Sequence, residues 1–259
     1  MPEWSIEDLK AYHLARPQWS KDGKYISFMQ SLWEGSYCGL IDVVSGNYKK
    51  LDLESGYTKL TWGPNHSIVN PNATYGDGFG LQFMFINSEN KVEDISKRFN
   101  KDNANFLESN FSTKGTKIVF TYQDEWGSNN DNIEMGISNI DGDEFIILDE
   151  GDIQSPFFSQ NDKNIFFVKT IEGKQYLFKY DLINKLIIRI VLLPNKFNVW
   201  EKLNWTEEGF LAITGRDVSS KLVMGGNHAR LFILDLKKQK VIYASPIYDQ
   251  FVNFVGFQD

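Results

Sequence analysis

The sequence predicts an all-β fold, a β-propeller built from four-stranded antiparallel blades, and two observations support this prediction. An aromatic residue recurs at intervals of 43, 49, 47, 47 and 49 residues, at positions Trp19, Trp62, Phe111, Phe158, Trp205 and Phe254. Each interval holds short alternating apolar runs separated by polar turns. A repeat of roughly 40–50 residues with β signals alone is typical of a propeller blade.

Each repeat opens with a hairpin. In residues 17–28, Asp22-Gly23 separates two alternating segments and supplies the residue of positive φ that a tight turn needs. Residues 110–120 and 156–167 follow the same pattern, and residues 60–68 and 203–211 follow it more loosely. A second hairpin closes the repeat, as in residues 40–48, 135–145 and 231–238. Each repeat therefore predicts four antiparallel strands. We expect every recurring aromatic residue to fill the wedge between neighbouring sheets.

The opening Pro-x-Trp-Ser-x-Asp-Gly-Lys at residues 17–24, followed by an Ile-x-Phe strand, resembles the repeat of TolB-like propellers. The same repeat occurs in the propeller domain of prolyl oligopeptidase family enzymes. This resemblance implies a fold and a core aromatic position, and it does not imply an activity.

Five complete repeats end near Ser245, and the rest of the chain begins a partial sixth. We expect the chain termini to close the ring, because closure removes exposed sheet edges. Residues 251–257 could pair with an N-terminal strand in a reduced sixth blade, or they could complete a five-bladed ring. A helix-like spacing of Ile6, Leu9 and Leu14 after Ser5 would favour five blades.

Composition fits one propeller domain over residues 1–259, because the repeat continues without a linker and 42% of the residues are hydrophobic. The first residues show no signal-peptide pattern, and no apolar run is long enough to cross a membrane. The sequence therefore predicts a cytoplasmic protein without membrane contact. Cys38, the single cysteine, is expected to be a small buried strand residue.

The net charge of −7 argues against nucleic acid as a partner, because phosphate binding needs a cationic surface. An acidic chain suits neutral or basic partners.

The connections between strands fall into two groups. In a four-stranded meander the first and third connections lie at one end of the sheet, here called the turn side. The second connection and the link to the next blade lie at the other end, the loop side. Connections on the turn side are short, and this side is expected to be structural. Four loop-side connections look long: residues 30–37, 70–80, 122–132 and 215–230.

Long loops in an economical repeat often carry binding, and aromatic side chains with polar neighbours make effective interface anchors. The sequence therefore predicts a binding surface on the loop side. Its candidate residues are Trp33, Glu34, Tyr75, Asp77, Asp124, Glu125, Trp126, Arg216, Asp217 and His228. The alternative for the tryptophans is that Trp33 and Trp126 fold back over the mouth of the channel.

The sequence supports metal binding and catalysis less well than it supports partner binding. Residues 124–132 are rich in oxygen ligands but lack the acidic spacing of a known calcium loop. The three histidines fall at separate places in the repeat, and no Gly-x-Ser-x-Gly elbow occurs. We therefore predict no catalytic residues, no metal and no cofactor.

These observations favour a non-catalytic scaffold that binds a protein or peptide through the loop side. The alternative is a lyase or hydrolase that acts on a carbohydrate or small ester near the channel mouth, through Asp77, Asp124, Asp217 and Arg216. A neutraliser of a basic protein is a third possibility.

Overall fold

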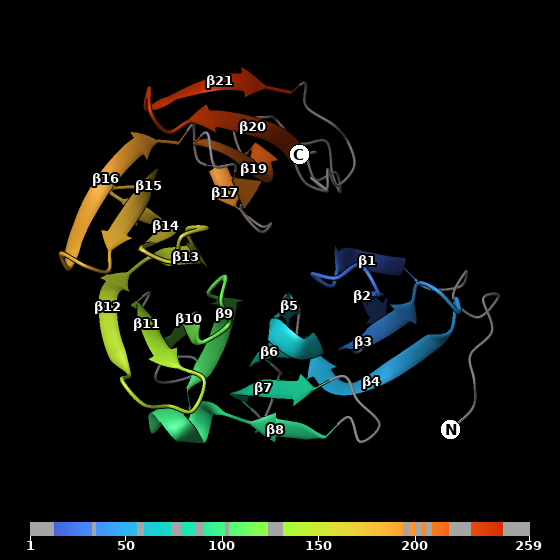
Figure 1. The fold of residues 1–259 in the computed structure, drawn as a ribbon. Coiled ribbons are helices and arrows are strands. Elements are labelled where there is room, and N and C mark those ends of the chain that lie inside the picture. Colours follow the sequence, from blue (N-terminus) through green and yellow to red (C-terminus); the bar gives the residue numbers. More distant parts are fainter. Residues whose placement is uncertain are drawn as a thin grey trace. The chain divides into compact units, whose positions relative to one another are not determined.

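The computed structural model describes residues 13–32, 35–55, 60–73, 79–85, 91–101, 104–123, 132–193, 197–199, 204–205, 209–217 and 229–245. The regular structure of the described chain is mostly β-strand, as predicted (Figure 1). It divides into two compact units, residues 1–130 with 134–148 and residues 131–133 with 149–259, and each is described by itself.

The described part of unit 1 contains three sheets in which consecutive strands pair as antiparallel neighbours, with Ile133 and residues 149–151 of the third sheet assigned to unit 2. The first sheet comprises β1 (His13–Trp19), β2 (Tyr25–Leu32), β3 (Gly35–Asp42) and β4 (Tyr48–Ser55). The second comprises β5 (Thr61–Trp62), β6 (Ser67–Ala73), β7 (Phe79–Phe85) and β8 (Val92–Asp94). The third comprises β9 (Asn105–Phe111), β10 (Lys117–Gln123), β11 (Ile133–Asn139) and β12 (Ile146–Gly151). Two 3₁₀ turns, η1 (Pro64–His66) and η2 (Ser96–Phe99), complete this part of the chain.

The described part of unit 2 contains a fourth sheet of four strands and a fifth sheet of five strands. The fourth sheet comprises β13 (Ile153–Phe158), β14 (Asn164–Ile171), β15 (Lys174–Asp181) and β16 (Leu186–Leu192). The fifth comprises β17 (Phe197–Val199), β18 (Asn204–Trp205), β19 (Phe210–Asp217), β20 (Ala229–Asp235) and β21 (Lys240–Ala244). Both β17 and β18 pair with β19.

Four of the five sheets in the described part are the predicted four-stranded antiparallel meanders, and the fifth has five strands because β17 and β18 both pair with β19. The six-bladed count is not confirmed, because residues 246–259 of the partial sixth repeat lie outside the described part. Residues 1–12 lie outside it as well. Leu14, the last residue of the helix-like spacing, lies in a strand, because β1 begins at His13. That the whole chain is one domain stays a prediction.

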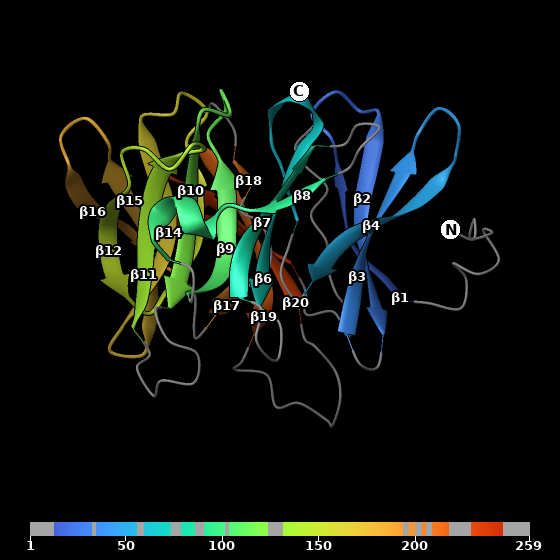
Figure 2. The same ribbon diagram turned by 90° about the horizontal axis from the view of Figure 1, so that it is seen from below.

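A repeated serine explains why the opening hairpins are so regular. The hydroxyl oxygens of Ser20, Ser112 and Ser159, each directly after an anchor aromatic residue, accept the backbone N–H five residues later at 3.0, 3.0 and 2.9 Å. Each hydroxyl is therefore bound to the far side of its own turn, where a buried polar group would otherwise lack a partner. In the side view of Figure 2, β9 and β10 stand side by side, in agreement with their antiparallel pairing.

Apolar clusters between neighbouring sheets form the core. In unit 1 one cluster joins the first and second sheets around Cys38, Leu51, Trp62 and Ile68. A larger one joins the second and third sheets and is rich in aromatic rings, including Phe99, Phe106, Phe120 and Tyr122. In unit 2 a third cluster joins the fourth and fifth sheets through residues such as Phe166, Leu177, Leu211 and Phe232. Cys38 is fully buried on β3, as expected.

The recurring aromatic residues are buried as predicted at three positions. Trp62, Phe111 and Phe158 are 5%, 5% and 6% exposed. Trp62 reaches the preceding sheet, where its Nε1–H donates to Ser27 Oγ at 2.8 Å and to the Gln18 carbonyl at 3.2 Å. The Phe111 ring lies so close to Gly63 of the second sheet that a Cβ there would meet ring carbons at 2.6 and 2.7 Å.

For Trp19 the prediction is wrong, because its side chain is 52% exposed. The equivalent rings in the second and third sheets are covered by the sheet that precedes them in the chain, and Trp19 belongs to the first sheet. The Trp205 side chain and all of Phe254 lie outside the described part.

The loops predicted on the loop side are longer than the connections that the strands leave between them. Register pairing runs Gln30↔Tyr37, Ser31↔Ser36 and Leu32↔Gly35, so residues 33–34 alone separate β2 from β3. The other three connections narrow to residues 74–78, 124–132 and 218–228, because their flanking residues extend the strands. The first was mistaken for a loop because Ser31, Gly35 and Ser36 are poor strand formers, and pairing with β1 and β4 overrides that preference.

Replacing Trp62 by alanine should lower the free energy of unfolding by about 3–5 kcal/mol, because it leaves a cavity between two sheets. The Trp19→Ala variant should lose about 1 kcal/mol or less, since its ring is half exposed. Urea denaturation followed by far-ultraviolet circular dichroism measures both. Equal losses for the two variants would contradict the assignment of Trp62 as the inter-sheet wedge.

Candidate functional site

Two turns of unit 1 meet on the turn side through an aspartate and a histidine. Asp22 lies in the turn between β1 and β2, and His66 is the last residue of η1 in the second sheet. His66 Nε2 lies 2.7 Å from Asp22 Oδ2. Residues 44 positions apart in the sequence thus form a polar clasp between two sheets, and we call this pair the Asp22–His66 clasp.

The backbone before β6 takes an uncommon form that aims His66 at Asp22. Asn65 and His66 have φ values of 52° and 57°, in the left-handed region that non-glycine residues seldom occupy. Gly63 closes this turn by donating its N–H to the Ser67 carbonyl at 2.8 Å. Unusual backbone held by a surrounding structure is often found at functional positions, so the turn is worth testing for a role.

Asp22 is held by more than the histidine. Its Oδ1 accepts hydrogen bonds from Ser20 Oγ at 2.9 Å and from the Lys24 backbone N–H at 3.3 Å. The Lys24 ammonium lies 3.4 Å from Oδ2. The hydrogen bond with His66, supported by these donors, holds the pKa of the Asp22 carboxyl well below its ordinary value. Asp22 is therefore ionised over the physiological range.

Aromatic rings support the clasp from beneath. The Tyr25 ring meets His66 edge-on, with 5.2 Å between ring centroids. Tyr25 also stacks on Trp62 at 6.3 Å and 12° between planes. Because Trp62 is itself hydrogen-bonded to the first sheet, the His66 ring rests on a rigid aromatic support.

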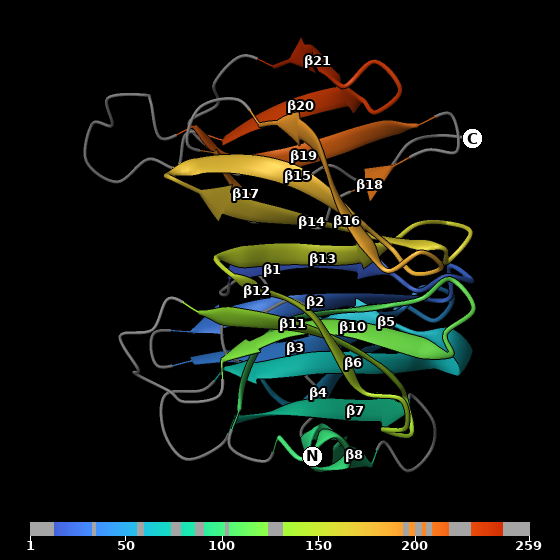
Figure 3. The ribbon, with the colours of Figure 1, turned by 90° about the vertical axis from the view of Figure 1, so that its left-hand side faces the viewer.

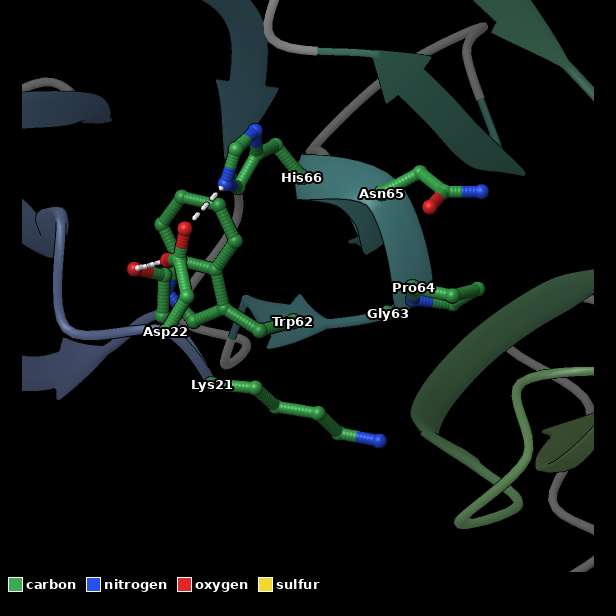
Figure 4. A pocket seen from close by; sticks show the side chains of 8 residues that line it. Lys21, Asp22, Trp62, Gly63, Pro64, Asn65 and His66 are labelled. Carbon is green, nitrogen blue, oxygen red and sulfur yellow. Dashed lines mark hydrogen bonds and ion pairs between the residues drawn. The ribbon is translucent and has the colours of Figure 1, made fainter.

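A pocket of about 330 Å³ opens beside the clasp (Figure 4). Its walls come from two turns, namely Ser20, Lys21 and Asp22 on one side and Trp62, Gly63, Pro64, Asn65 and His66 on the other. In Figure 4 the His66 ring points toward Asp22, and the Lys21 side chain extends away from that pair.

A third turn lies close to the pocket. Lys21 Nζ donates to the carbonyl of Thr113 at 3.1 Å, in the turn between β9 and β10. Gly115 in the same turn has φ +71°, and a Cβ there would meet Pro64 ring carbons at 2.3–2.8 Å. Position 115 therefore requires glycine, because its φ is positive and because the Pro64 ring leaves no room for a Cβ. The opening turns of three successive sheets converge around the pocket.

The hydrogen bonds define what this arrangement can do chemically. In a serine hydrolase triad the histidine bonds the nucleophilic hydroxyl and the aspartate bonds the other ring nitrogen. Here the Ser20 hydroxyl donates to Asp22, and Asp22 stands between the serine and His66. The described side chains thus form a fixed charged wall rather than a serine activated by histidine. The described part also contains no group of three or more His, Cys, Asp or Glu side chains placed to hold a metal ion.

The loop-side candidates cannot be placed. Trp33, Glu34, Tyr75, Asp77, Asp124, Glu125, Trp126 and His228 lie outside the described residues. The backbone of Arg216 and Asp217 is described, and it lies in β19 opposite Asn198 and Phe197 of β17. The prediction that these two residues belong to a loop is therefore wrong, because β19 continues through them. The binding role of the whole set stays a prediction.

Sequence reasoning missed the clasp for an identifiable reason. Short turn-side connections predict a structural role, and the sequence gives His66 no partner because it lies far from the other histidines in the repeat. The available signal was the comparison between repeats, since Pro64-Asn65-His66 replaces the usual Asp-Gly or Lys-Gly turn in the second one.

Substituting Asp22 by asparagine should make stability less dependent on pH. The folded-state pKa is lowered, so the carboxylate stabilises the fold fully above its ordinary value of 3.8, and this contribution is lost as the pH falls below that value. Thermal unfolding midpoints of the native chain and the Asp22→Asn variant should differ at pH 6 and converge toward pH 2.5. Asp143→Asn, at an exposed turn position of the third sheet, is the control. A gap that is constant with pH would contradict the role of the clasp.

No helix in the described part of the chain has the length and apolar character needed to span a membrane.

The chain matches no family model and no curated protein. Several solved structures are similar to it. TolB from Acinetobacter baumannii aligns with a TM-score of 0.66 and 14% identity, over 92% of this chain and 55% of that one. A TolB-type protein from Agrobacterium tumefaciens gives 0.64 and 14%, over 91% and 82%. A prolyl endopeptidase gives 0.57 and 16%, over 90% and 35%.

This chain thus spans about half the length of the Acinetobacter protein. At such identities the likeness shows the fold alone. It confirms the resemblance seen in the opening repeat: the chain has a TolB-like β-propeller fold.

Proposed function

We propose that this propeller is a non-catalytic scaffold that binds a protein or peptide partner, and that the pocket beside the Asp22–His66 clasp contributes to binding. The observation that carries the proposal is the construction of this pocket. Its polar groups are fixed by hydrogen bonds, its floor rests on stacked aromatic rings, and three turns converge on it.

The size and chemistry of the pocket suit part of a polypeptide. A volume of about 330 Å³ is near the lower end of the range for small-molecule sites. It can accept one or two side chains of a bound segment. The Trp62 ring and Pro64 offer apolar contact, while Lys21 and the clasp offer charges of both signs. Such a mixture of rigid apolar surface and oriented polar groups is typical of recognition sites.

The loop side remains a second part of this proposal. The connections over residues 124–132 and 218–228 stay long after the strands are placed, and long loops on a regular scaffold frequently bind partners. The acidic charge of −7 favours a neutral or basic partner over nucleic acid. The cytoplasmic location stays a prediction.

A selection from random peptides tests the proposal and locates the binding side. The intact chain is immobilised, and a phage-displayed dodecapeptide library is selected on it. Recovered peptides are then titrated against a pocket variant, Lys21→Glu/His66→Gln, and a loop variant, Trp33→Ala/Trp126→Ala. We expect saturable binding that weakens about tenfold or more, or at least ~1.4 kcal/mol, in the pocket variant.

Lys163→Glu is the matched control, since it changes the same charge in the opening turn of the fourth sheet. Circular dichroism must show that all variants fold equally. Loss of binding in the loop variant alone would move the site to the loop side. Failure to recover any saturable peptide would overturn the proposal. Cleavage of a bound peptide, detected by mass spectrometry, would favour the hydrolase alternative.

A further inference from the structure

The outermost strand of the fourth sheet has an unusual surface. β16 (Leu186–Leu192) is the last strand of its sheet in the described part of the chain, paired with β15 on one side. Six of its seven residues are aliphatic, and the seventh is Arg189. Leu186, Ile187, Ile188 and Leu192 are 57%, 42%, 40% and 50% exposed. In Figure 3, β16 runs in front of β14 and β15 of its own sheet.

The other outer strands carry the features that usually protect a sheet edge. β8 is three residues long and has two acidic residues. β12 carries Asp149 and Glu150, and β4 carries two lysines, an aspartate and a glutamate. β21 is shorter than β16 and begins with Lys240. β16 combines length, β-branched residues and exposed apolar area, which are the properties of a strand that can add a further strand.

The register shows which part of β16 is available. Leu186, Ile187, Ile188 and Arg189 pair regularly with Asp181, Tyr180, Lys179 and Phe178. The register then shifts, with Arg189 opposite Phe178 and Val191 opposite Leu177. Ile190 and Val191 pack against the core cluster between the fourth and fifth sheets. Among the described residues, the regular edge of β16 that carries no further strand therefore covers residues 186–189, enough for a short extended segment.

Charge decides between possible occupants. Residues 153–193 contain six Lys or Arg and three Asp or Glu, although the chain as a whole has a net charge of −7. Arg189 lies over the Tyr176 ring, 5.0 Å from its centroid, and makes no ion pair within the described part. Lys179 lies opposite Ile188, on the other face of the sheet from Arg189, so the cation that faces Ile187's side of the strand is Arg189. A second copy paired antiparallel along residues 186–189 would place Leu186 opposite Arg189 and would offer the guanidinium no carboxylate, because these four residues include no acidic side chain.

We propose that β16 binds an extended acidic segment of a partner protein by strand addition along residues 186–189. Side chains alternate between the two faces of a strand, so Leu186 and Ile188 share one face and Ile187 and Arg189 the other. A partner segment would match this pattern if its aliphatic side chains lay on the face of Leu186 and Ile188 and its carboxylates lay on the face of Arg189. Backbone hydrogen bonds supply affinity, and the side-chain pattern supplies specificity. This surface is separate from the turn-side pocket and does not depend on it.

The test uses the full chain and a fluorescein-labelled hexapeptide of alternating valine and glutamate, read by fluorescence anisotropy. A valine–lysine hexapeptide tests charge, and a valine–glutamate hexapeptide with N-methylated backbone tests strand pairing. We expect saturable binding of the first peptide alone. The Arg189→Glu variant should bind it at least about tenfold more weakly and should gain affinity for the lysine peptide. This exchange of preference cannot result from loss of folding.

Ile188→Lys should also weaken binding, by placing a charge on the edge. Its matched control is Ile147→Lys on β12, at a residue that is 51% exposed, and this variant should bind normally. The proposal is overturned if the N-methylated peptide binds equally well, or if no peptide binds saturably. It is also overturned if sedimentation shows a dimer of the native chain that Ile188→Lys abolishes, because the occupant is then a second copy.

Discussion

The packing of one sheet's first strand against the preceding sheet is the interaction on which the rest of unit 1 depends. Trp62 shows it best, because its ring is buried between two sheets and its Nε1–H is bound to Ser27 and Gln18. A four-stranded sheet with two apolar faces cannot be stable alone, so each repeat needs its neighbour. The same ring supports Tyr25 and, through it, His66. The candidate site is thus a consequence of how the fold is held together.

The turn side therefore carries the candidate site, although the long connections of this protein lie on the loop side. Turns on the turn side are tight because a buried serine fixes three of the opening hairpins. The second repeat lacks that serine and has Gly63 instead, followed by a proline and two residues of positive φ. The departure from the repeat is local, and it is also where the pocket forms. In repeat proteins such departures indicate function more clearly than the repeat itself does.

Much of the fold could be predicted from the sequence, because its signals are local. Asp-Gly turns, alternating strands and a regular period predicted the four four-stranded meanders and the burial of Trp62, Phe111 and Phe158. The exposure of Trp19 could not be predicted, since burial of a ring depends on the sheet that covers it. The short connection between β2 and β3 was missed because pairing with two neighbouring strands, and not local propensity, determines where these strands end.

The candidate site was less predictable than the fold. Asp22 and His66 are 44 positions apart, and nothing in either local segment shows that they meet. The aromatic and acidic residues of the loop side drew attention because composition is visible in a sequence, whereas geometry is not. The exposed edge of β16 could be predicted only in part. Its aliphatic run is plain in the sequence, but such a run is equally typical of a buried strand.

Hydrogen–deuterium exchange of the full chain, with and without a saturating selected peptide, would test the central claim most directly. If the pocket beside the Asp22–His66 clasp binds a polypeptide, amide protection should increase in the turns over residues 20–24 and 63–67. Protection confined to residues 124–132 and 218–228, with these two turns unchanged, would contradict it.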